Sequence, residues 1–524
     1  MPKKFNITGD CKPSLHYMVD LHSRLVKIKA LIDDGQYFVI NRARQYGKTT
    51  TLAALDRFIC DDYIVFSIDF QMSMSSAKFS DEYKFSSAFA KAMMKTAPKE
   101  SSDEFTGAVK KLDEVVKGNY DLVDLFDHIE DICSASPRPV VLIIDEVDSA
   151  SNNQIFLDFL AQLRGCYLNR ENQATFRSVI LAGVHDVRYL QQKIRPDAEH
   201  KHNSPWNIAS SFDVDMSFSP DDIAGMLQEY EKDNETGMDI PAISKLIYDY
   251  TSGYPVLVSH ICKLIDEAED NDECKSWNER GVKEAVKKLL TLNTPLFESL
   301  VNKLEQFPKL KKQLEQILEN GRSIPYRPDD DAVKQAIMYG FVRVLNGNIV
   351  VSNRIFETRF YDMLLTAPEV QELPLYRASE REKPMFIKDG HLDMELVLEK
   401  FVEYFSDIYG TENQSFIESD GRKLFLIYLR PIINGIGNYY IEAETRDHKR
   451  TDVIVDYLGE QFIIEMKIWH GKEYNEQGEH QLVDYLESHH ADKGYMLTFN
   501  FNKTKTTGVK TVNIGNMTIV EAVV

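Results

Sequence analysis

Residues 37–53 (YFVINRARQYGKTTTLA) constrain the fold of this chain more than any other stretch. A short apolar run is followed by a polar loop, by Gly47-Lys48-Thr49-Thr50, and then by residues that favour a helix. This order predicts a strand, a loop and a helix, the setting in which loop N–H groups and a helix N-terminus bind phosphate. Lys48 would then reach the β- and γ-phosphates of a nucleotide, and the Thr49 hydroxyl would ligate Mg²⁺.

The loop departs from the usual pattern at one position. A phosphate-binding loop has the pattern G-x-x-x-x-G-K-[ST], and Arg42 stands where the first Gly is expected. A chance Gly-Lys-Thr at the start of a helix is therefore an open alternative for this stretch alone. On the phosphate-loop interpretation, the ATP-binding residues are Gln45, Tyr46, Gly47, Lys48, Thr49 and Thr50.

A second motif lies about 95 residues downstream, in PRPVVLIIDEVDSA (137–150). The apolar run Val140–Ile144 predicts a central parallel strand that is covered on both faces. It ends in Asp145-Glu146, where Asp145 would hold Mg²⁺ and Glu146 would polarise the attacking water. A buried strand that ends in acidic surface residues is the alternative. Because each motif has its strand context, the pair predicts ATP binding with Mg²⁺.

Further strands at 61–71 and 177–187, with largely helical residues 80–135 between them, predict a parallel α/β layer. His185 and Asp186 end the last strand, where a sensor of the γ-phosphate often lies. Four arginines are candidates for stabilising the transition state, and each is individually a candidate structural arginine: Arg164, Arg170, Arg188 and Arg195. Tyr17 could stack on adenine or be a packed aromatic residue.

From residue 219 onward the pattern is mainly helical. Ser219-Pro220 is a good helix start, and a Gly-x-Pro break at 251–262 separates two helices. A helix, a hairpin around Asn346-Gly347-Asn348 and a helix resemble a winged-helix unit. Its acidic flanks favour a docking element over a DNA reader. Residues 366–386 are rich in Pro and charge, which predicts an interdomain linker.

The last 140 residues carry a second constellation. Asp452 and Glu465-Met466-Lys467 lie on consecutive strands joined by a turn at 458–460, so a hairpin would bring Asp452 beside Glu465. Glu465 and Lys467 share one face because strand side chains alternate. Two carboxylates and a lysine can bind a divalent cation and position water against a phosphodiester. A solvated hairpin with alternating charge is the alternative. Gln481 and Tyr485 lie four residues apart on a following helix.

On these motifs the chain resembles bacterial and archaeal AAA-like (STAND-related) P-loop ATPases fused to a C-terminal nuclease of the PD-(D/E)xK superfamily. The loop NRARQYGKTT, IIDEVD, SGYP and the segment TDVIVDYLGEQFIIEMKIW carry the resemblance, and in that family Arg often replaces the first Gly of the loop. The resemblance implies Asp452, Glu465 and Lys467 as nuclease catalytic residues, with Gln481 and Tyr485 in support. Glu418 is a looser match. Metal ligands would be Thr49 and Asp145 for Mg²⁺, and Asp452 and Glu465 for Mg²⁺ or Mn²⁺.

The expected fold class is α/β. We expect an AAA-like P-loop ATPase core at 1–218, a helical lid and winged-helix-like region at 219–365, a linker at 366–386, and a restriction-endonuclease-like domain at 387–524. The leading hypothesis is a nucleotide-regulated nuclease, with a role in defence against foreign or mobile DNA. A signalling or scaffold ATPase, whose nuclease-like domain only binds nucleic acid or a partner, is the second. A mechanical ATPase such as a helicase is the third.

Composition limits the partners. The chain has 524 residues and a net charge of -21, so a nucleic-acid contact needs a local basic patch or metal ions. We expect nucleic acid as the partner, with DNA favoured over RNA, and a homo-oligomer is one assembly that the chain could form. The six cysteines are scattered, and the start lacks the apolar core of a signal peptide. The sequence therefore predicts a cytoplasmic protein with reduced thiols and no membrane segment.

Overall fold

The computed structural model describes residues 2–99, 102–150, 153–184, 206–269, 275–320, 324–365, 368–409, 418–434, 436–440, 453–458, 460–488, 491–502 and 504–524. They form two units. Unit 1 comprises Met1–Tyr248, Gly253–Ala285 and Met338–Gly340, and unit 2 comprises Asp249–Ser252, Val286–Ile337 and Phe341–Val524. These boundaries differ from the four expected segments, which stay a prediction.

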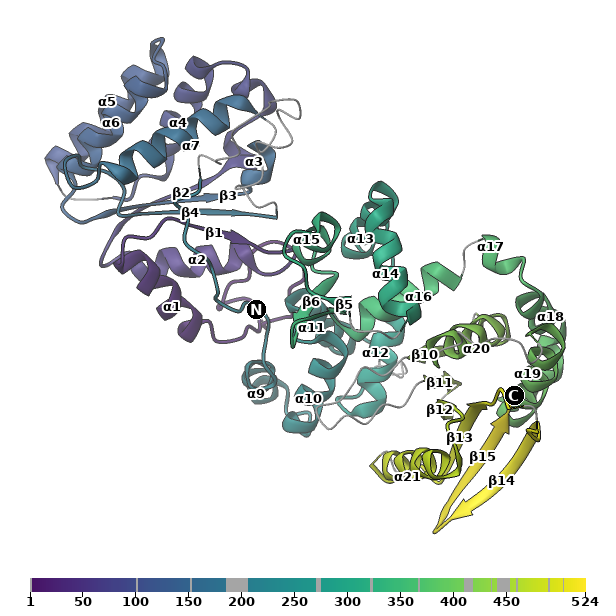
Figure 1. The fold of residues 1–524 in the computed structure, drawn as a ribbon. Coiled ribbons are helices and arrows are strands. Elements are labelled where there is room, and N and C mark those ends of the chain that lie inside the picture. The colour runs from purple at the N-terminus through teal and green to yellow at the C-terminus, as the bar shows by residue number, and fades with distance from the viewer. Residues whose placement is uncertain are drawn as a thin grey trace. The chain divides into compact units, whose positions relative to one another are not determined.

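Unit 1 is built on a parallel sheet of four strands in the order β1-β4-β3-β2 (Figure 1). The strands are β1 (Phe38–Asn41), β2 (Ile64–Asp69), β3 (Val140–Asp145) and β4 (Ser178–Gly183). Every residue of β3 and β4 is buried. The reason is that helices cover both faces of the sheet, so a strand in its centre needs no polar side. A parallel sheet with helical regions matches the expected α/β class and is compatible with a P-loop ATPase core.

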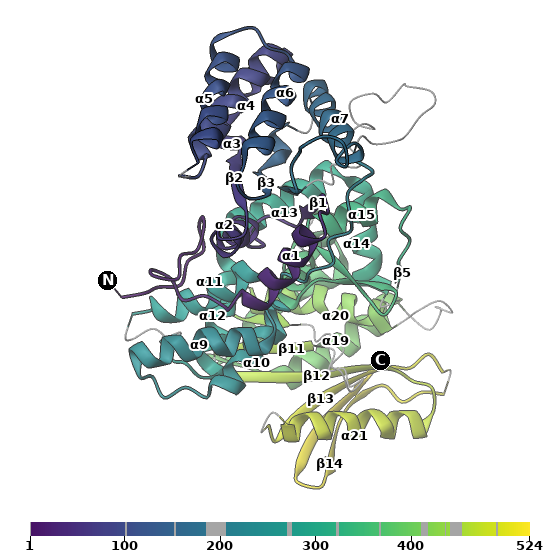
Figure 2. The same cartoon turned by 90° about the vertical axis from the view of Figure 1, so that its left-hand side faces the viewer.

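Two apolar cores lie on opposite faces of this sheet. On one face, Ile143 and Ile180 pack with helices α1 (His22–Asp33) and α2 (Lys48–Ile59). On the other face, Leu142 and Ile144 pack with residues from the helices that follow β2 and β3. Figure 2 shows α4, α5 and α6 together beyond β2 and β3. The helices on this second face are α3 (Phe70–Ser73), α4 (Glu82–Thr96), α5 (Asp103–Lys117), α6 (Leu122–Ala135) and α7 (Gln154–Leu168). The prediction that residues 80–135 are largely helical is confirmed.

The remaining helices of unit 1 begin at the predicted Ser219. Its side chain accepts an N–H from Asp222, and Asp222 returns the bond as a capping box. The Gly-x-Pro break separates two helices as expected. These helices are α9 (Pro220–Asn234), α10 (Ile240–Thr251) and α11 (Pro255–Asp266), followed by α12 (Glu279–Thr291) at the boundary of the two units.

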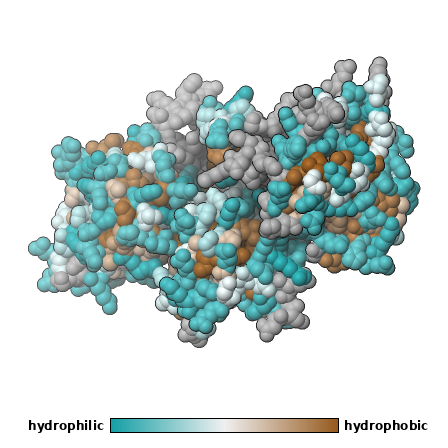
Figure 3. Space-filling view, turned by 90° about the horizontal axis from the view of Figure 1, so that it is seen from below, coloured by the Kyte–Doolittle hydropathy of each residue, from teal (hydrophilic) through white to brown (hydrophobic). Residues whose placement is uncertain are grey.

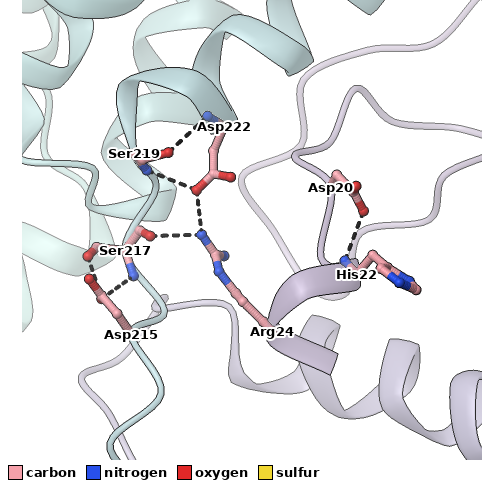
Figure 4. Close-up of polar contacts among 7 residues, drawn as sticks. All are labelled: Asp20, His22, Arg24, Asp215, Ser217, Ser219 and Asp222. Atoms are coloured by element: carbon pink, nitrogen blue, oxygen red, sulfur yellow. Dashed lines mark hydrogen bonds and ion pairs between the residues drawn. The ribbon is translucent and has the colours of Figure 1, made fainter. Parts of the chain in front are cut away.

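A buried arginine ties the first helix of the chain to the start of α9 (Figure 4). The guanidinium of Arg24, on α1, lies 2.7 Å from Asp222 Oδ2 and donates to the Ser217 carbonyl at 2.8 Å. Asp222 also accepts the Ser219 N–H at 2.9 Å. Charge-assisted bonds of this kind are stronger than neutral ones. The ion pair therefore fixes the helical region of unit 1 against α1.

The helix, hairpin and helix that the sequence predicts around Asn346-Gly347-Asn348 are confirmed. The hairpin turns at Asn346-Gly347, both of which have positive φ, as a tight hairpin turn requires. A short third strand extends it to the order β5-β7-β6. The elements are α13 (Pro295–Gln306), α14 (Pro308–Asn320), β5 (Ile324–Pro325), α15 (Asp331–Met338), β6 (Val342–Leu345), β7 (Asn348–Val351) and α16 (Arg354–Leu365).

Residues 366–386 differ from the aperiodic linker that their composition predicts. They contain α17 (Pro368–Gln371), α18 (Pro374–Glu382) and a 3₁₀ turn (Lys383–Phe386), and α18 packs against helix α20. Leu375, Tyr376, Ala378 and Ser379 are buried. The missed signal is Pro374 at the first helical position, followed by this short i, i+3 and i+4 stripe.

The C-terminal part of unit 2 is a mixed six-stranded sheet in the order β10-β11-β12-β13-β15-β14. β12, β13 and β15 run parallel in its centre. Helices lie on both faces, since Phe499 of β13 packs against Phe405 of α19, and the preceding Thr498 contacts Asn475 of α21. The elements are β8 (Ile387–Lys388), β9 (His391–Leu392), α19 (Met394–Tyr409), α20 (Glu418–Ile433), β10 (Asn438–Tyr440), β11 (Val453–Tyr457), β12 (Glu460–Ile468), α21 (Lys472–Ser488), β13 (Lys493–Phe499), β14 (Gly508–Ile514) and β15 (Met517–Val523).

The surface agrees with the composition. The face drawn in Figure 3 is mostly hydrophilic, with hydrophobic residues in separate patches. None of the helices in the described ranges combines the length and hydrophobicity that crossing a bilayer requires. Cys11, Cys60, Cys133, Cys166 and Cys262 are free thiols, and Cys274 lies outside the described residues.

Candidate functional site

The predicted phosphate loop of unit 1 connects β1 to α2. Gly47 precedes the helix with a φ of 77°, and Gln45 has a φ of 58°, so two residues of the loop are left-handed. These turns lead the chain into α2 with its first N–H groups unbonded, as at every helix N-terminus. Lys48 and Thr49 thus begin the helix at the carboxyl end of the sheet, where α/β folds bind ligands.

Lys48 is 6% exposed. Its ammonium donates to the carbonyl oxygens of Arg42 at 3.0 Å and Ala43 at 3.1 Å, which holds it within the curve of the loop. Burial lowers the pKa of Lys48, while Glu146, Asp148 and Asp145 act in the opposite direction. The Lys48 ammonium is thus held against the backbone of the loop.

The two predicted halves of the nucleotide site meet at Thr49 and Asp145. The Thr49 hydroxyl donates to Asp145 Oδ2 at 2.8 Å. Burial raises the pKa of Asp145 above its usual value. Hydroxyl and carboxylate oxygens are ligands that Mg²⁺ prefers, directly or through its waters. The pair therefore fits a magnesium ion bound with the phosphates of a nucleotide.

Glu146 follows in a strained backbone conformation, with a φ of 55°. Its N–H donates to Asp145 Oδ1 at 2.9 Å. Burial, and next the charge of Asp145, raise the pKa of Glu146. Strain in a non-glycine residue is often found at functional sites. Glu146 is thus held beside the Thr49–Asp145 pair.

The structure explains why Arg42 replaces the expected glycine. Its guanidinium donates to the carbonyl oxygens of Val214 at 3.0 Å and Phe212 at 3.3 Å, and it lies 5.3 Å from the centre of the Phe212 ring. Residue 210 also bridges Phe38 of β1 in parallel. Arg42 therefore anchors the chain that runs beside β1.

Two residues that the sequence analysis did not assign contact the site. The Tyr254 hydroxyl donates to the Arg44 carbonyl at 2.9 Å, and its ring packs 4.7 Å from that of Tyr46. Asp148 Oδ2 accepts the Val184 N–H at 2.6 Å, just beyond the end of β4. Tyr254 belongs to the SGYP motif and Asp148 to the IIDEVD motif. Their places in these motifs were the sequence signal that could have assigned them to the site.

Several other predicted residues can be placed. Gln45 is exposed, and Thr50 Oγ1 accepts the Cys11 N–H at 3.0 Å. Tyr17 is 4% exposed and packs 5.1 Å from the Tyr230 ring, so it is a packed aromatic residue and not an adenine platform.

The structure describes two of the four candidate arginines, Arg164 and Arg170. Arg170 donates to the Gly35 carbonyl, ahead of β1 and at the opposite edge of the sheet from the loop, so its role is structural. Arg164 lies on α7. His185, Asp186, Arg188 and Arg195 lie outside the described residues.

In unit 2, the predicted carboxylate and lysine are adjacent on β12. Glu465 is 1% exposed, and Lys467 Nζ lies 2.8 Å from Glu465 Oε1. The described hairpin pairs run from Val453–Ile464 to Tyr457–Glu460, which is the register that the prediction of Asp452 beside Glu465 assumes. Asp452 itself lies outside the described residues. No group of three metal-ligating side chains forms among the residues that are described.

The predicted supporting residues are on the expected elements. Gln481 is exposed on α21, Tyr485 lies one turn later, and Glu418 begins α20. The side chains of Tyr485 and Glu418 are outside the described part.

A buried polar network that the sequence analysis missed lies on the same face as Glu465. Glu465, Met496 and Glu521 are directly paired across β12, β13 and β15, so their side chains share a face. Glu521 is 1% exposed; it accepts from Asn475 of α21 at 2.8 Å and lies 2.5 Å from Lys510 Nζ. An acidic residue inside the apolar run TIVEAVV was the signal.

Comparisons with known proteins give distant likenesses only. Neither a protein-family model nor a curated protein matches this chain. Among solved structures, the Walker-type ATPase PABY2304 of Pyrococcus abyssi is 12% identical, covering 68% of this chain and 99% of that one, with a TM-score of 0.46. The Aeropyrum pernix ORC2 protein (14%, 68% and 94%, TM-score 0.39) and Cdc6p from Pyrobaculum aerophilum (14%, 69% and 97%, TM-score 0.32) are similar. Likeness at this level does not establish a family.

Proposed function

We propose that unit 1 binds and hydrolyses ATP with Mg²⁺. The observation that supports this most is the 2.8 Å contact between Thr49 and Asp145 beside the buried Lys48. When bound, the ion would neutralise phosphate charge. Lys48 would hold the phosphates, Thr49 and Asp145 would hold the ion and its waters, and Glu146 would orient the attacking water.

We further propose that the C-terminal part of unit 2 is a metal-dependent nuclease that the nucleotide regulates. The close pair of Glu465 and Lys467 supports this, because a carboxylate can hold a divalent cation and a lysine can stabilise the charge that develops on a phosphodiester. Asp452 would be the second carboxylate, with Gln481, Tyr485 and Glu418 in support. We propose foreign or mobile DNA as the substrate and the cytoplasm as the location.

A cleavage assay tests the nuclease. Single- and double-stranded DNA and RNA would be incubated with the full chain and Mg²⁺ or Mn²⁺, with and without ATP. Glu465→Gln should abolish cleavage, and it leaves Lys467 an amide oxygen to bond. Glu460→Gln is the matched control, because Glu460 lies on the same strand and its side chain is 42% exposed. It should cut like the wild type.

The same assay tests the link between the two sites. Lys48→Ala should change the response to ATP and leave the basal fold intact. Cleavage by Glu465→Gln at the wild-type rate would refute the nuclease. If ATP is hydrolysed and no nucleic acid is cut under any condition, the scaffold ATPase becomes the better description.

A further inference from the structure

The charge of the C-terminal part is unevenly distributed along the chain. Residues 385–524 contain 14 Lys and Arg and 23 Asp and Glu. The 28 residues from Lys493 to Val520 contain four of these lysines and no acidic residue. At the average composition of the chain, a stretch of this length would carry about four acidic residues. The segment is also rich in Thr and Asn, whose side chains can bond phosphate oxygens.

The loop within this segment leaves β13 at the same end of the sheet as the candidate nuclease pair. β12 and β13 are parallel, and Lys467 pairs with Thr498. The Trp469 N–H donates to the Phe499 carbonyl at 2.9 Å, so the end of β12 adjoins the start of the loop at residue 500. The loop 500–507 therefore leaves the sheet next to the strand end that carries Lys467.

The segment then returns as β14, the outer strand of the sheet, which Figure 1 shows at the edge in yellow. One side of β14 pairs with β15 and the other has no neighbouring strand in the described part of the chain. The exposed polar residues of the loop and strand are Asn502, Thr504, Thr506, Thr507, Lys510, Thr511 and Asn513. We call this surface, together with Lys505, the β14 rim.

The lysines of the segment differ in their partners. Lys493, at the amino end of β13, forms an ion pair with Glu395. Lys510 pairs with buried Glu521 and keeps 62% of its own side chain exposed. Lys505 lies 5.9 Å from the centre of the Phe501 ring, and no carboxylate among the described residues pairs with it. Lys503 lies outside the described residues. Among those that the structure describes, Lys505 and Lys510 are thus the cations of the rim.

We propose that the β14 rim binds the phosphodiester backbone of the nucleic acid that the Glu465–Lys467 site acts on, an inference that rests on the proposed nuclease function. The charge of the rim is opposite to that of phosphate, whereas the rest of the C-terminal part is acidic and would repel it. The rim extends from β14, the outer strand of the sheet, through the loop 500–507 to the carboxyl end of β12, which carries Lys467. A backbone strand lying on it would therefore be guided to that site.

Lysines on an edge strand have another known use, which is to prevent pairing with the edge of a second molecule. The two interpretations give different results in a binding experiment. A phosphate-binding lysine contributes to the salt dependence of nucleic-acid binding, and a lysine that only protects an edge does not.

The test measures binding of labelled single-stranded DNA, duplex DNA and RNA by fluorescence anisotropy. The protein is the full chain carrying Glu465→Gln, so that no probe is cut, and salt varies between about 50 and 200 mM. Lys505→Gln should weaken binding several-fold and reduce the slope of log K against log salt by about one. Lys493→Gln is the matched control, because it removes the same charge from the other end of β13. It should change neither quantity.

A second variant combines Lys510→Gln with Glu521→Gln, so that no carboxylate is left at the buried position without its lysine and the new amide oxygen there can still accept from Asn475. It should also reduce the slope. Thermal melting confirms that each variant is folded. Unchanged binding by Lys505→Gln, or an equal loss in Lys493→Gln, would overturn the β14 rim and leave the proposed nuclease standing. If the parent binds none of the probes, the rim is refuted, and the cleavage assay decides separately on the nuclease.

Discussion

The Thr49 hydroxyl donates a 2.8 Å hydrogen bond to Asp145, joining two motifs that are 96 residues apart in the chain. β1 and β3 are not neighbours in the sheet, since β4 lies between them. The contact forms because the carboxyl ends of parallel strands all lie at the same end of the sheet. It is the geometric basis for the proposed ATP site.

Removing the hydroxyl at this contact should stop ATP hydrolysis. Thr49→Val keeps the shape of the side chain and loses the magnesium ligand. Because a bound metal supplies several kcal/mol of transition-state stabilisation, the rate should fall about 100-fold or more. Thr49→Ser retains the hydroxyl and should stay within a few-fold of the wild type, as measured by phosphate release. Equal rates in the two variants would exclude Thr49 from the site.

Restoring the usual glycine at position 42 should weaken the fold. Arg42→Gly removes two charge-assisted bonds, to Phe212 and Val214, and should lower the free energy of unfolding by about 2–4 kcal/mol. Arg44→Gly makes the same substitution at an exposed residue of the loop. Chemical denaturation of both variants compares them directly. A loss in Arg44→Gly as large as in Arg42→Gly would contradict the anchoring role.

Gly253 should not tolerate a side chain. Its φ is 72°, and a Cβ there would lie 1.9 Å from the Phe218 carbonyl oxygen, so Gly253→Ala forces the backbone to move. Gly237 has a φ of 75° and nothing within 4 Å of its Cβ position. Gly237→Ala therefore isolates the cost of the left-handed conformation, about 1–2 kcal/mol. Thermal melting should show a clearly larger loss for Gly253→Ala, and similar losses would refute the close contact.

The stability of the protein should depend on pH through His260, on α11. Burial lowers the pKa of His260 below 6.5. The unfolded chain thus binds a proton at a higher pH than the folded chain does. This contribution to stability is complete above pH 6.5 and is lost as the pH falls towards the folded pKa. Between about pH 8 and pH 5, His260→Gln should lose less stability than the wild type. Identical pH profiles would show that His260 titrates normally.

The elements that could be predicted are those with a local cause. The apolar run Val140–Ile144 allows only a strand covered on both faces, and Ser219-Pro220 allows a helix to begin. The prediction for residues 366–386 missed the nine-residue helix α18. These residues are rich in Pro and charge, and the one buried stripe of α18 is too short to produce a clear helical pattern. α18 gains its stability from packing on α20, which no local pattern reports.

The strand–loop–helix order around Gly47, the Asp145-Glu146 strand end, the helix starts and the shared face of Glu465 and Lys467 could be predicted, because each depends on periodicity or on residues near in the chain. Three relationships could be seen only in the folded chain: Arg42 anchors residues 212–214, Tyr254 contacts the loop, and Glu521 lies in the same row as Glu465. These relationships depend on strand order and register. Both are set by how the whole sheet buries its apolar faces, and no short stretch of sequence carries that information.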